Sequence, residues 1–285
     1  MQLKVNSCFW LLLAGFWLMH CPAKAENLVP SGDFEDETLA GQWAPPDQVS
    51  QTKEDRVSGD SALCYKGQTW AVSPELAGVD PQQSYVLQVF MKDSKGDLTV
   101  LLGLQLFDEN GEQISSFSVA PIPGTEAVLL KGASEGDKVL HIEGNPWEPI
   151  PQTATAVAFD AKEDLSDLPN PRTAAIERIV AGNAGSFEVN LSSPLAQSYP
   201  AGTRVRQHRY ADFPVMSFEP GKDWEAHRFE IGGVSEPGII EQGKFWHGTR
   251  AVRPAFAGLI RGAASMASGG PVELLVDDLS FLRVD

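Results

Sequence analysis

The chain has 285 residues, with 38 acidic side chains against 22 basic ones and a formal net charge of −16 at neutral pH. A surface with this excess of negative charge repels phosphate backbones and anionic lipid, which excludes nucleic acid as an expected partner. The length is ample for one large β domain or two small ones with a buried core.

The first 25 residues have the pattern of a signal peptide. Lys4 precedes an apolar run over residues 8–19, and Ala23–Ala25 forms a small-x-small cleavage site before Glu26. The run is shorter than the ~20 apolar residues of a membrane span. We therefore expect an exported chain, periplasmic or extracellular, without a membrane span, whose mature part begins at Glu26.

The three cysteines predict that the mature chain has no internal disulfide. Cys8 and Cys21 lie in the signal peptide, so that Cys64 remains alone. The alternative of a lipoprotein acylated at Cys21 is less favoured, because bulky Met19 and His20 stand where small residues are needed.

The mature sequence favours β-strands in chain order. Short alternating apolar runs at Ser84–Met91, Leu98–Phe107 and Val272–Val284 are typical of strands, and Asp108–Gly111 has the chemistry of a tight turn. Thr173–Val180, after a Pro-Asn-Pro breaker, predicts either a helix or a strand. Strands with one polar face each must bury the other against a second sheet, which gives a sandwich.

Four segments in this order carry a family resemblance. They are Asn27–Glu35 with the following Trp43, Trp70–Pro74 leading into Tyr85–Lys92, Gln105–Gly111 and Val276–Phe281. Together they resemble carbohydrate-binding modules of the galactose-binding-like jelly-roll type, over about residues 26–120 and 215–285. The resemblance implies an all-β jelly-roll β-sandwich over 26–285, with a large insertion or sub-domain at about 144–213.

A structural calcium ion (Ca²⁺) is a further implication of the resemblance. First and last strands of jelly rolls commonly lie side by side, which would bring Asp33 and Glu35 near Asp277 and Asp278. Ca²⁺ takes six to eight oxygen ligands, which carboxylates and turn carbonyls supply. The alternative is that these side chains cap turns or face water.

Residues 203–210 form the most distinctive local segment. As a strand, they would place Arg204, Arg206, His208 and Tyr210 on one face. Arginine binds carboxylate and sulfate with two parallel hydrogen bonds, so this face would suit an anionic polysaccharide. The alternative is that the arginines pair with the acidic run Asp160–Asp167.

Exposed tryptophans would serve a glycan-binding protein, because sugar rings stack on indoles. Trp147 and Trp246 lie in loop-like contexts and are the candidates for a binding platform, although a core position is equally open for both. Trp43 and Trp70 are expected in the core or at its rim.

No motif for catalysis is found, and no catalytic residue is assigned. The leading hypothesis is a secreted non-catalytic protein that binds a polysaccharide or glycoconjugate, with surface proteins as further possible partners. The alternative is a polysaccharide lyase or related carbohydrate-active enzyme acting on uronate-containing glycans, with Arg204 or Arg206 neutralising the uronate and His208 or Tyr210 moving the proton. A structural cell-surface protein is the third option.

Overall fold

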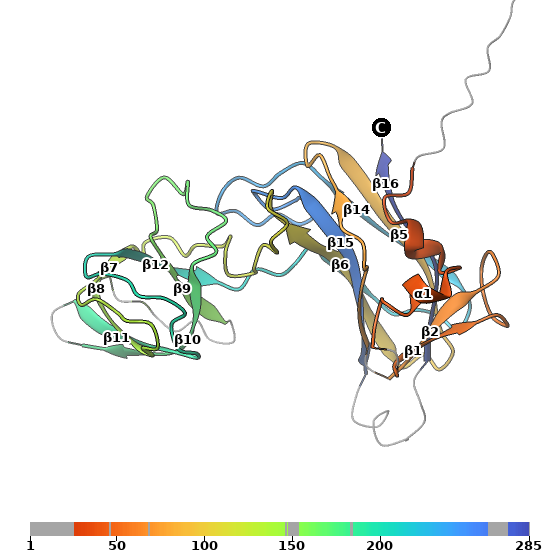
Figure 1. Cartoon of the computed structure of the whole chain (residues 1–285), viewed down its shortest axis with the longest axis horizontal. Coiled ribbons are helices and arrows are strands. Elements are labelled where there is room, and N and C mark those ends of the chain that lie inside the picture. The colour runs from red at the N-terminus through yellow and green to blue at the C-terminus, as the bar shows by residue number, and fades with distance from the viewer. Residues whose placement is uncertain are drawn as a thin grey trace, which may run out of the picture.

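The computed structural model describes residues 26–284, apart from positions 46, 68, 146, 148–153, 183–184 and 262–272. The predicted signal peptide lies outside the described residues. Two lobes are visible: a β-sandwich that contains both ends of the described chain, and a smaller β-barrel (Figure 1). The predicted all-β class with a large central insertion is confirmed.

The sandwich consists of two antiparallel sheets. The first, named here the β5 sheet, has the strand order β1 (Val49–Thr52), β2 (Ala62–Lys66), β16 (Glu273–Val284), β5 (Ser84–Asp93), β14 (Glu225–Gly232). The second, the β6 sheet, has the order β13 (Val215–Phe218), β6 (Leu98–Phe107), β15 (Ala251–Ile260), β3 (Thr69–Val72), with β4 (Ala77–Gly78) also paired to β15.

Alternation along the long strands builds the core between these sheets. Leu87, Val89 and Met91 of β5 point inward, as do Leu102 and Leu104 of β6, and all are buried. Each such side chain stabilises the fold by ~1.5–3 kcal/mol through burial. The predicted strands around residues 84–91, 98–107 and 272–284 are therefore confirmed, as is the turn that follows β6.

The two ends of the described chain lie side by side, as expected. Asn27 bridges to Leu282, and the Leu28 N–H donates to the Phe281 carbonyl at 2.9 Å. A short 3₁₀ helix η1 (Pro30–Asp33) and a single α-helical turn α1 (Glu37–Ala40) follow. The N-terminal segment thereby lies along β16.

The barrel is the insertion between the strands of the β6 sheet. Its closed order is β10 (Thr173–Ala181), β11 (Ser186–Leu191), β8 (Val139–Gly144), β7 (Ala127–Leu129), β12 (Arg204–Arg209), β9 (Thr155–Phe159). It has its own apolar core, separate from that of the sandwich. The segment predicted as helix or strand is strand β10.

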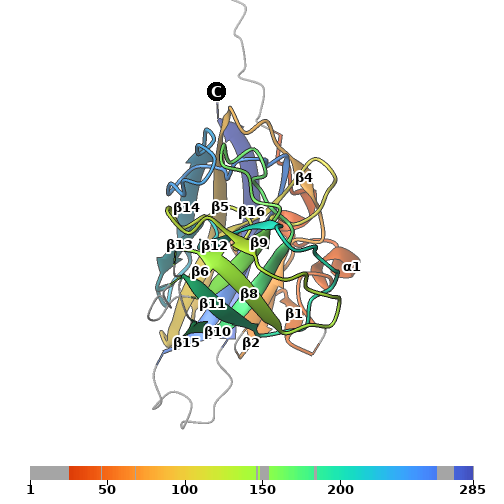
Figure 2. The same ribbon diagram turned by 90° about the vertical axis from the view of Figure 1, so that its left-hand side faces the viewer.

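The barrel begins earlier than the predicted insertion range of 144–213. Strands β7 and β8 precede that range, because their short apolar runs do not differ in composition from those of the sandwich. The two connecting segments lie against each other: the Arg209 N–H donates to the Ala120 carbonyl and the Ala211 N–H to the Ser116 carbonyl, both at 2.9 Å. Figure 2 shows the barrel in front of the sandwich.

Cys64 is a buried free thiol, and burial raises its pKa. Within the described residues, no helix is long and apolar enough to cross a membrane.

Candidate functional site: an aromatic cavity on the outer face of the β6 sheet

The outer face of the β6 sheet faces the barrel (Figure 1). Since Leu104 points into the core, the neighbouring Gly103 and Gln105 point outward. Ala255 of β15 pairs with Gly103, and Trp70 of β3 pairs with Ala257, which places the indole on the same outer face. The small residues Gly103 and Ala255 lie beside the large indole of Trp70, and this difference in size produces a recess in the outer face of the sheet.

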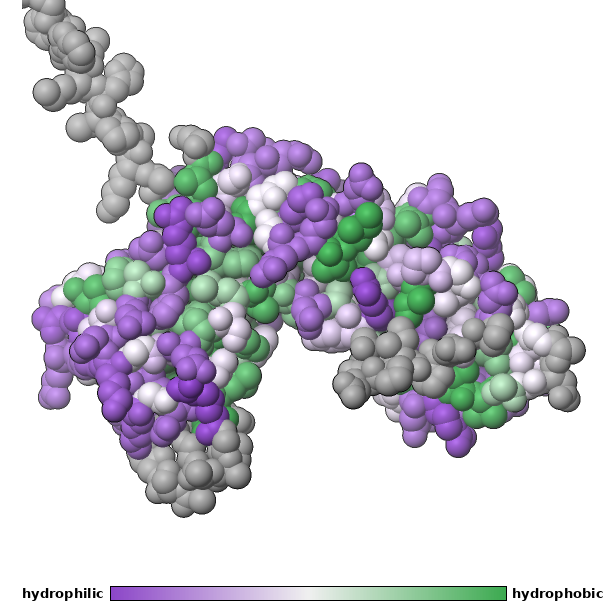
Figure 3. All heavy atoms as spheres, turned by 180° about the vertical axis from the view of Figure 1, so that it is seen from behind, coloured by the Kyte–Doolittle hydropathy of each residue, from purple (hydrophilic) through white to green (hydrophobic). Residues whose placement is uncertain are grey.

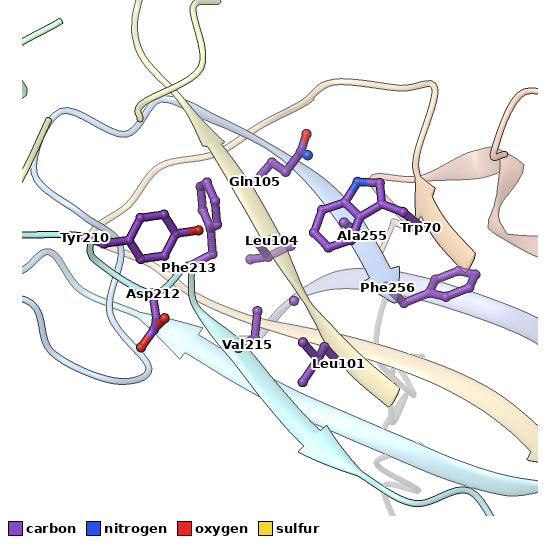
Figure 4. Close-up of a pocket in the computed structure, with 11 residues that line it drawn as sticks. Trp70, Leu101, Leu104, Gln105, Tyr210, Asp212, Phe213, Val215, Ala255 and Phe256 are labelled. Carbon is purple, nitrogen blue, oxygen red and sulfur yellow. The ribbon is translucent and has the colours of Figure 1, made fainter. Parts of the chain in front are cut away.

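The connecting segment after β12 closes one end of this recess. Tyr210, Asp212, Phe213 and Val215 line it together with the strand residues, around a cavity of about 170 Å³. The Tyr210 ring packs edge-on against Phe117, with 5.4 Å between the ring centroids. Figure 4 shows the Trp70 and Tyr210 rings on opposite sides of the cavity, with the Asp212 carboxylate at the Tyr210 end.

Gly103 allows β13 to approach the floor of the cavity. A Cβ atom at this position would lie 2.2 Å from the Pro214 carbonyl oxygen and 2.5 Å from a methyl group of Val215. Only glycine therefore fits where the segment from the barrel crosses β6, and the wall of the cavity depends on that crossing.

Two aromatic side chains in the described chain are exposed, and both line this cavity. Trp70 is 55% exposed and Tyr210 is 42% exposed. Exposed aromatic rings that gather at one recess with polar groups beside them are typical of a binding surface. Rings of this kind can stack on the apolar C–H face of a sugar, while Gln105 and Asp212 can bind hydroxyl groups.

A second cavity of about 370 Å³ lies next to the first. It shares Asp212, Phe213 and Val215 with it and continues to Ile240 and Trp246. Seen from behind, the space-filling surface is hollowed between the two lobes (Figure 3). The recess therefore comprises two adjoining cavities.

The sequence assigned Trp70 to the core or rim, and the structure corrects this assignment. The alternation Trp70-Ala71-Val72 was a usable signal, because in a strand Ala71 must face opposite to its neighbours. Ala71 is buried in the sandwich core. Which of the two faces met the core was not readable from the sequence.

The predicted basic face does not form a binding surface. The alternation is as expected, but Arg206 is 1% exposed and His208 0% exposed. The Arg206 guanidinium donates to Asp167 at 3.0 Å and to the His208 Nε2 at 3.1 Å. Arg204 is exposed and lies 3.6 Å from Glu163, while only Tyr210 reaches the cavity. The pairing with the acidic run 160–167 is therefore what the structure shows.

Burial also determines the protonation of this network. His208 Nδ1 lies 2.6 Å from the Phe117 carbonyl oxygen, and desolvation lowers the pKa of His208 to about 4. A neutral imidazole donates from Nδ1 and accepts the Arg206 N–H at Nε2. The arginine, histidine and tyrosine required for the predicted lyase chemistry are not brought together in a cleft.

Trp147 and Trp246 are buried and do not form a binding platform. Trp147, 3% exposed, packs in the barrel core, and its indole N–H donates to the Thr125 carbonyl at 2.7 Å. Trp246, 1% exposed, stacks on Phe213 with 5.2 Å between the ring centroids. Their loop-like sequence contexts misled, because the loop of Trp147 folds over the barrel core and that of Trp246 over the sandwich core.

The predicted calcium ligands accept backbone hydrogen bonds. Asp277 is buried and accepts the N–H groups of Val57 and Ser58 at 2.7 and 3.0 Å. Burial raises the pKa of the Asp277 carboxyl, against the lowering effect of these donors. Glu35 likewise accepts the N–H of Asp60 at 2.9 Å.

Asp33 and Asp278 complete the predicted ligand set. The Asp33 carboxylate caps the N–H of Glu35 at 3.2 Å, and Asp278 has a positive φ of 47° at an irregularity of β16. Among the described residues, no group of three or more His, Cys, Asp or Glu side chains is placed to hold a metal ion. Three of the four carboxylates thus accept backbone N–H groups, those of Asp33, Glu35 and Asp277.

No protein-family model and no curated protein sequence matches the chain. Among solved structures, TmCBM61 in complex with beta-1,4-galactotriose is similar at 9% identity and a TM-score of 0.36, over 91% of this chain and 100% of that one. Family 16 Carbohydrate Binding Module-2 is similar at 11% identity and a TM-score of 0.32, over 90% and 99% of the respective chains. The enzymatically active domain of bacteriophage CBA120 tailspike protein 4 is similar at 10% identity and a TM-score of 0.28, over 90% of this chain and 21% of that one.

Proposed function

We propose that the chain is a non-catalytic carbohydrate-binding protein whose glycan lies in the cavity on the outer face of the β6 sheet. The observation that carries this proposal is the pairing of Trp70 and Tyr210. They are the exposed aromatic rings of the described chain, and they face one cavity from two separate segments.

The physical basis is the combination of apolar and polar surface in the recess. A sugar ring has apolar C–H faces and polar hydroxyl edges, so a site for it needs a ring to stack on and hydrogen-bonding groups beside it. Trp70 supplies the first, and Gln105 with Asp212 supplies the second. Stacking on an indole also orders few side-chain torsions, which limits the entropy cost of binding.

Export to the periplasm or the cell exterior is part of the proposal, and it rests on the signal-peptide pattern of residues 1–25. Calcium binding at Asp33, Glu35, Asp277 and Asp278 stays a prediction of the family resemblance. Thermal unfolding with added calcium and with a chelator tests it, and equal midpoints would reject it.

Affinity electrophoresis of the mature chain through gels containing single polysaccharides tests the proposal. At least one polymer should retard the chain, and Trp70→Ala should weaken that binding about tenfold or more, because truncating a central aromatic contact costs ~2 kcal/mol. Leu130→Ala is the matched control, since Leu130 is 41% exposed but lies on the barrel.

Three outcomes would speak against the proposal. Absence of retardation by every polymer would favour the structural role. Unchanged retardation of Trp70→Ala would place the site elsewhere. Release of unsaturated uronates, followed by ultraviolet absorbance, would favour the lyase.

A further inference from the structure

Arg253 continues the floor of the cavity along β15. It lies directly opposite Gln105 in the strand register, and Gln105 lines the cavity. Opposed residues on one face have Cβ atoms ~4.5–5.5 Å apart. Arg253 therefore points to the same outer face, beside the polar edge of the cavity.

The guanidinium of Arg253 is held by a ring and not by a carboxylate. Its Cζ atom lies 5.2 Å from the centroid of the Phe107 ring. Its Nε is shielded from solvent and has no hydrogen-bond partner among the described residues. No Asp or Glu of the described chain forms an ion pair with it, whereas Arg228 and Arg261 pair with Glu230 and Glu219.

Arg253 differs from the other arginines of the described chain in combining a shielded Nε that has no hydrogen-bond partner with a stacked aromatic ring. Arg253 as a whole is partly exposed although its Nε is closed to solvent, so that an anion can approach the guanidinium from the solvent side. Stacking on an aromatic ring fixes the plane of the guanidinium and leaves its edge available for a carboxylate or a sulfate.

We infer that Arg253 binds an anionic substituent, a carboxylate or a sulfate ester, of the glycan that stacks on Trp70. This inference deepens the proposed function and rests on it. Arg253 and Ala255 are two strand positions apart, which corresponds to ~7 Å. Ala255 lies beside the Trp70 ring in Figure 4, so a charged group next to the stacked sugar reaches Arg253.

The opposite end of the cavity has the opposite charge. Asp212 lies at the Tyr210 side, away from Gln105 (Figure 4). An anionic substituent is repelled there and attracted at Arg253, which gives the bound chain a direction. The site thereby selects charge although the protein as a whole repels anions.

Isothermal titration calorimetry with matched polymers tests this inference. Polygalacturonate and its methyl ester share a backbone and differ in the carboxylate, and dextran sulfate and dextran differ in the sulfate. Wild-type protein should bind one anionic polymer about tenfold or more tightly than its neutral counterpart, with an affinity that falls as salt rises. Arg253→Gln should abolish the preference while keeping the neutral affinity.

Arg228→Gln is the control, because it removes the same charge from an exposed position on β14. Equal affinities of wild type and Arg253→Gln for the anionic polymers, with Trp70→Ala still impaired, would overturn the inference and leave the proposed function standing. Tighter binding of the neutral polymers by wild type would overturn the inference too. If the wild-type chain bound none of the four polymers and no polysaccharide retarded it in affinity electrophoresis, both the inference and the proposed function would be contradicted.

Discussion

Arg206, Asp167 and His208 show how a basic strand can be buried in an acidic protein. The arginine finds its carboxylate on a segment far along the chain, and the histidine stays neutral between the guanidinium and a backbone carbonyl. The charges are paired and hydrogen-bonded, which is the condition for burying them. The rings that remain exposed, Trp70 and Tyr210, lie elsewhere.

Removing one partner of the buried ion pair should lower the free energy of unfolding far more than removing one partner of an exposed ion pair. Asp167→Asn leaves the Arg206 charge buried without its counter-ion, and we expect a loss of ~3–5 kcal/mol in the free energy of unfolding. Glu163→Gln, at the exposed pair with Arg204, should cost less than ~1 kcal/mol. Urea titration measures both, and similar losses for the two variants would refute the account of the buried network.

His208 predicts a pH dependence of stability. Its pKa is about 4 in the folded chain against an ordinary 6.5, so the unfolded chain binds the proton first as pH falls. The stabilisation is fully present above pH 6.5 and is lost as pH falls from 6.5 to about 4. The folded protein should lose on the order of 3 kcal/mol in this window.

Comparing two histidine variants separates the contribution of His208 to this pH dependence from that of other groups. His208→Gln should flatten the fall in the urea midpoint, while His247→Gln, at an exposed residue, should not. His227, whose pKa burial also lowers, contributes in the same window and remains in both variants. An equal fall in wild type and His208→Gln would contradict the assignment.

The sequence predicted residue types better than residue environments. It identified the basic segment 203–210 and, as one of two alternatives, its pairing with the acidic run. It could not show that the segments around Phe117 and Lys162 cover the same face, because that depends on contacts between distant parts of the chain. Arg253 was missed for the same reason, since its partner ring is on another strand.

The crossing of β13 over β6 is the element on which the candidate site depends. Gly103→Ala should displace β13, because its new methyl group would meet the Pro214 carbonyl and Val215 at 2.2 and 2.5 Å. Gly258→Ala is the matched control on the neighbouring strand, where the nearest atoms lie at 3.7 Å. We expect Gly103→Ala to lower the unfolding midpoint and weaken glycan binding, and Gly258→Ala to do neither. Thermal unfolding and affinity electrophoresis measure both, and wild-type behaviour of Gly103→Ala would argue against a tight crossing.

Strand patterns were predictable where the strands are long and alternate regularly. The runs at β5, β6 and β16 matched their structural bounds closely, because one face of each meets a single core. The segment that forms β10 was ambiguous, because its alanines favour a helix whereas its isoleucines and valine favour a strand. Pairing with β9 and β11 decides for the strand.

At the scale of the molecule, two separate apolar cores predict two units of local stability. Leu140→Ala, in the barrel core, should speed amide hydrogen exchange across 127–209 and leave β5 and β16 nearly unchanged. Leu87→Ala, in the sandwich core, should do the reverse. Uniform acceleration over both lobes in either variant would show that the chain opens as one cooperative unit.

The position of the barrel relative to the sandwich could not be derived from the sequence. That position matters for the candidate site, because the segment that leaves the barrel supplies Tyr210 and Asp212 to a cavity whose floor belongs to the β6 sheet. A site built by the attachment of an insertion has no local motif.

Hydrogen exchange with and without the polysaccharide that retards the chain most strongly would locate the glycan on the protein. If the glycan lies in the cavity, we expect protection in the segments that surround it, which are residues 69–72, 101–105, 209–215 and 253–257. Protection confined to the outer face of the β5 sheet or to the barrel loop 193–199, with none in these segments, would contradict it.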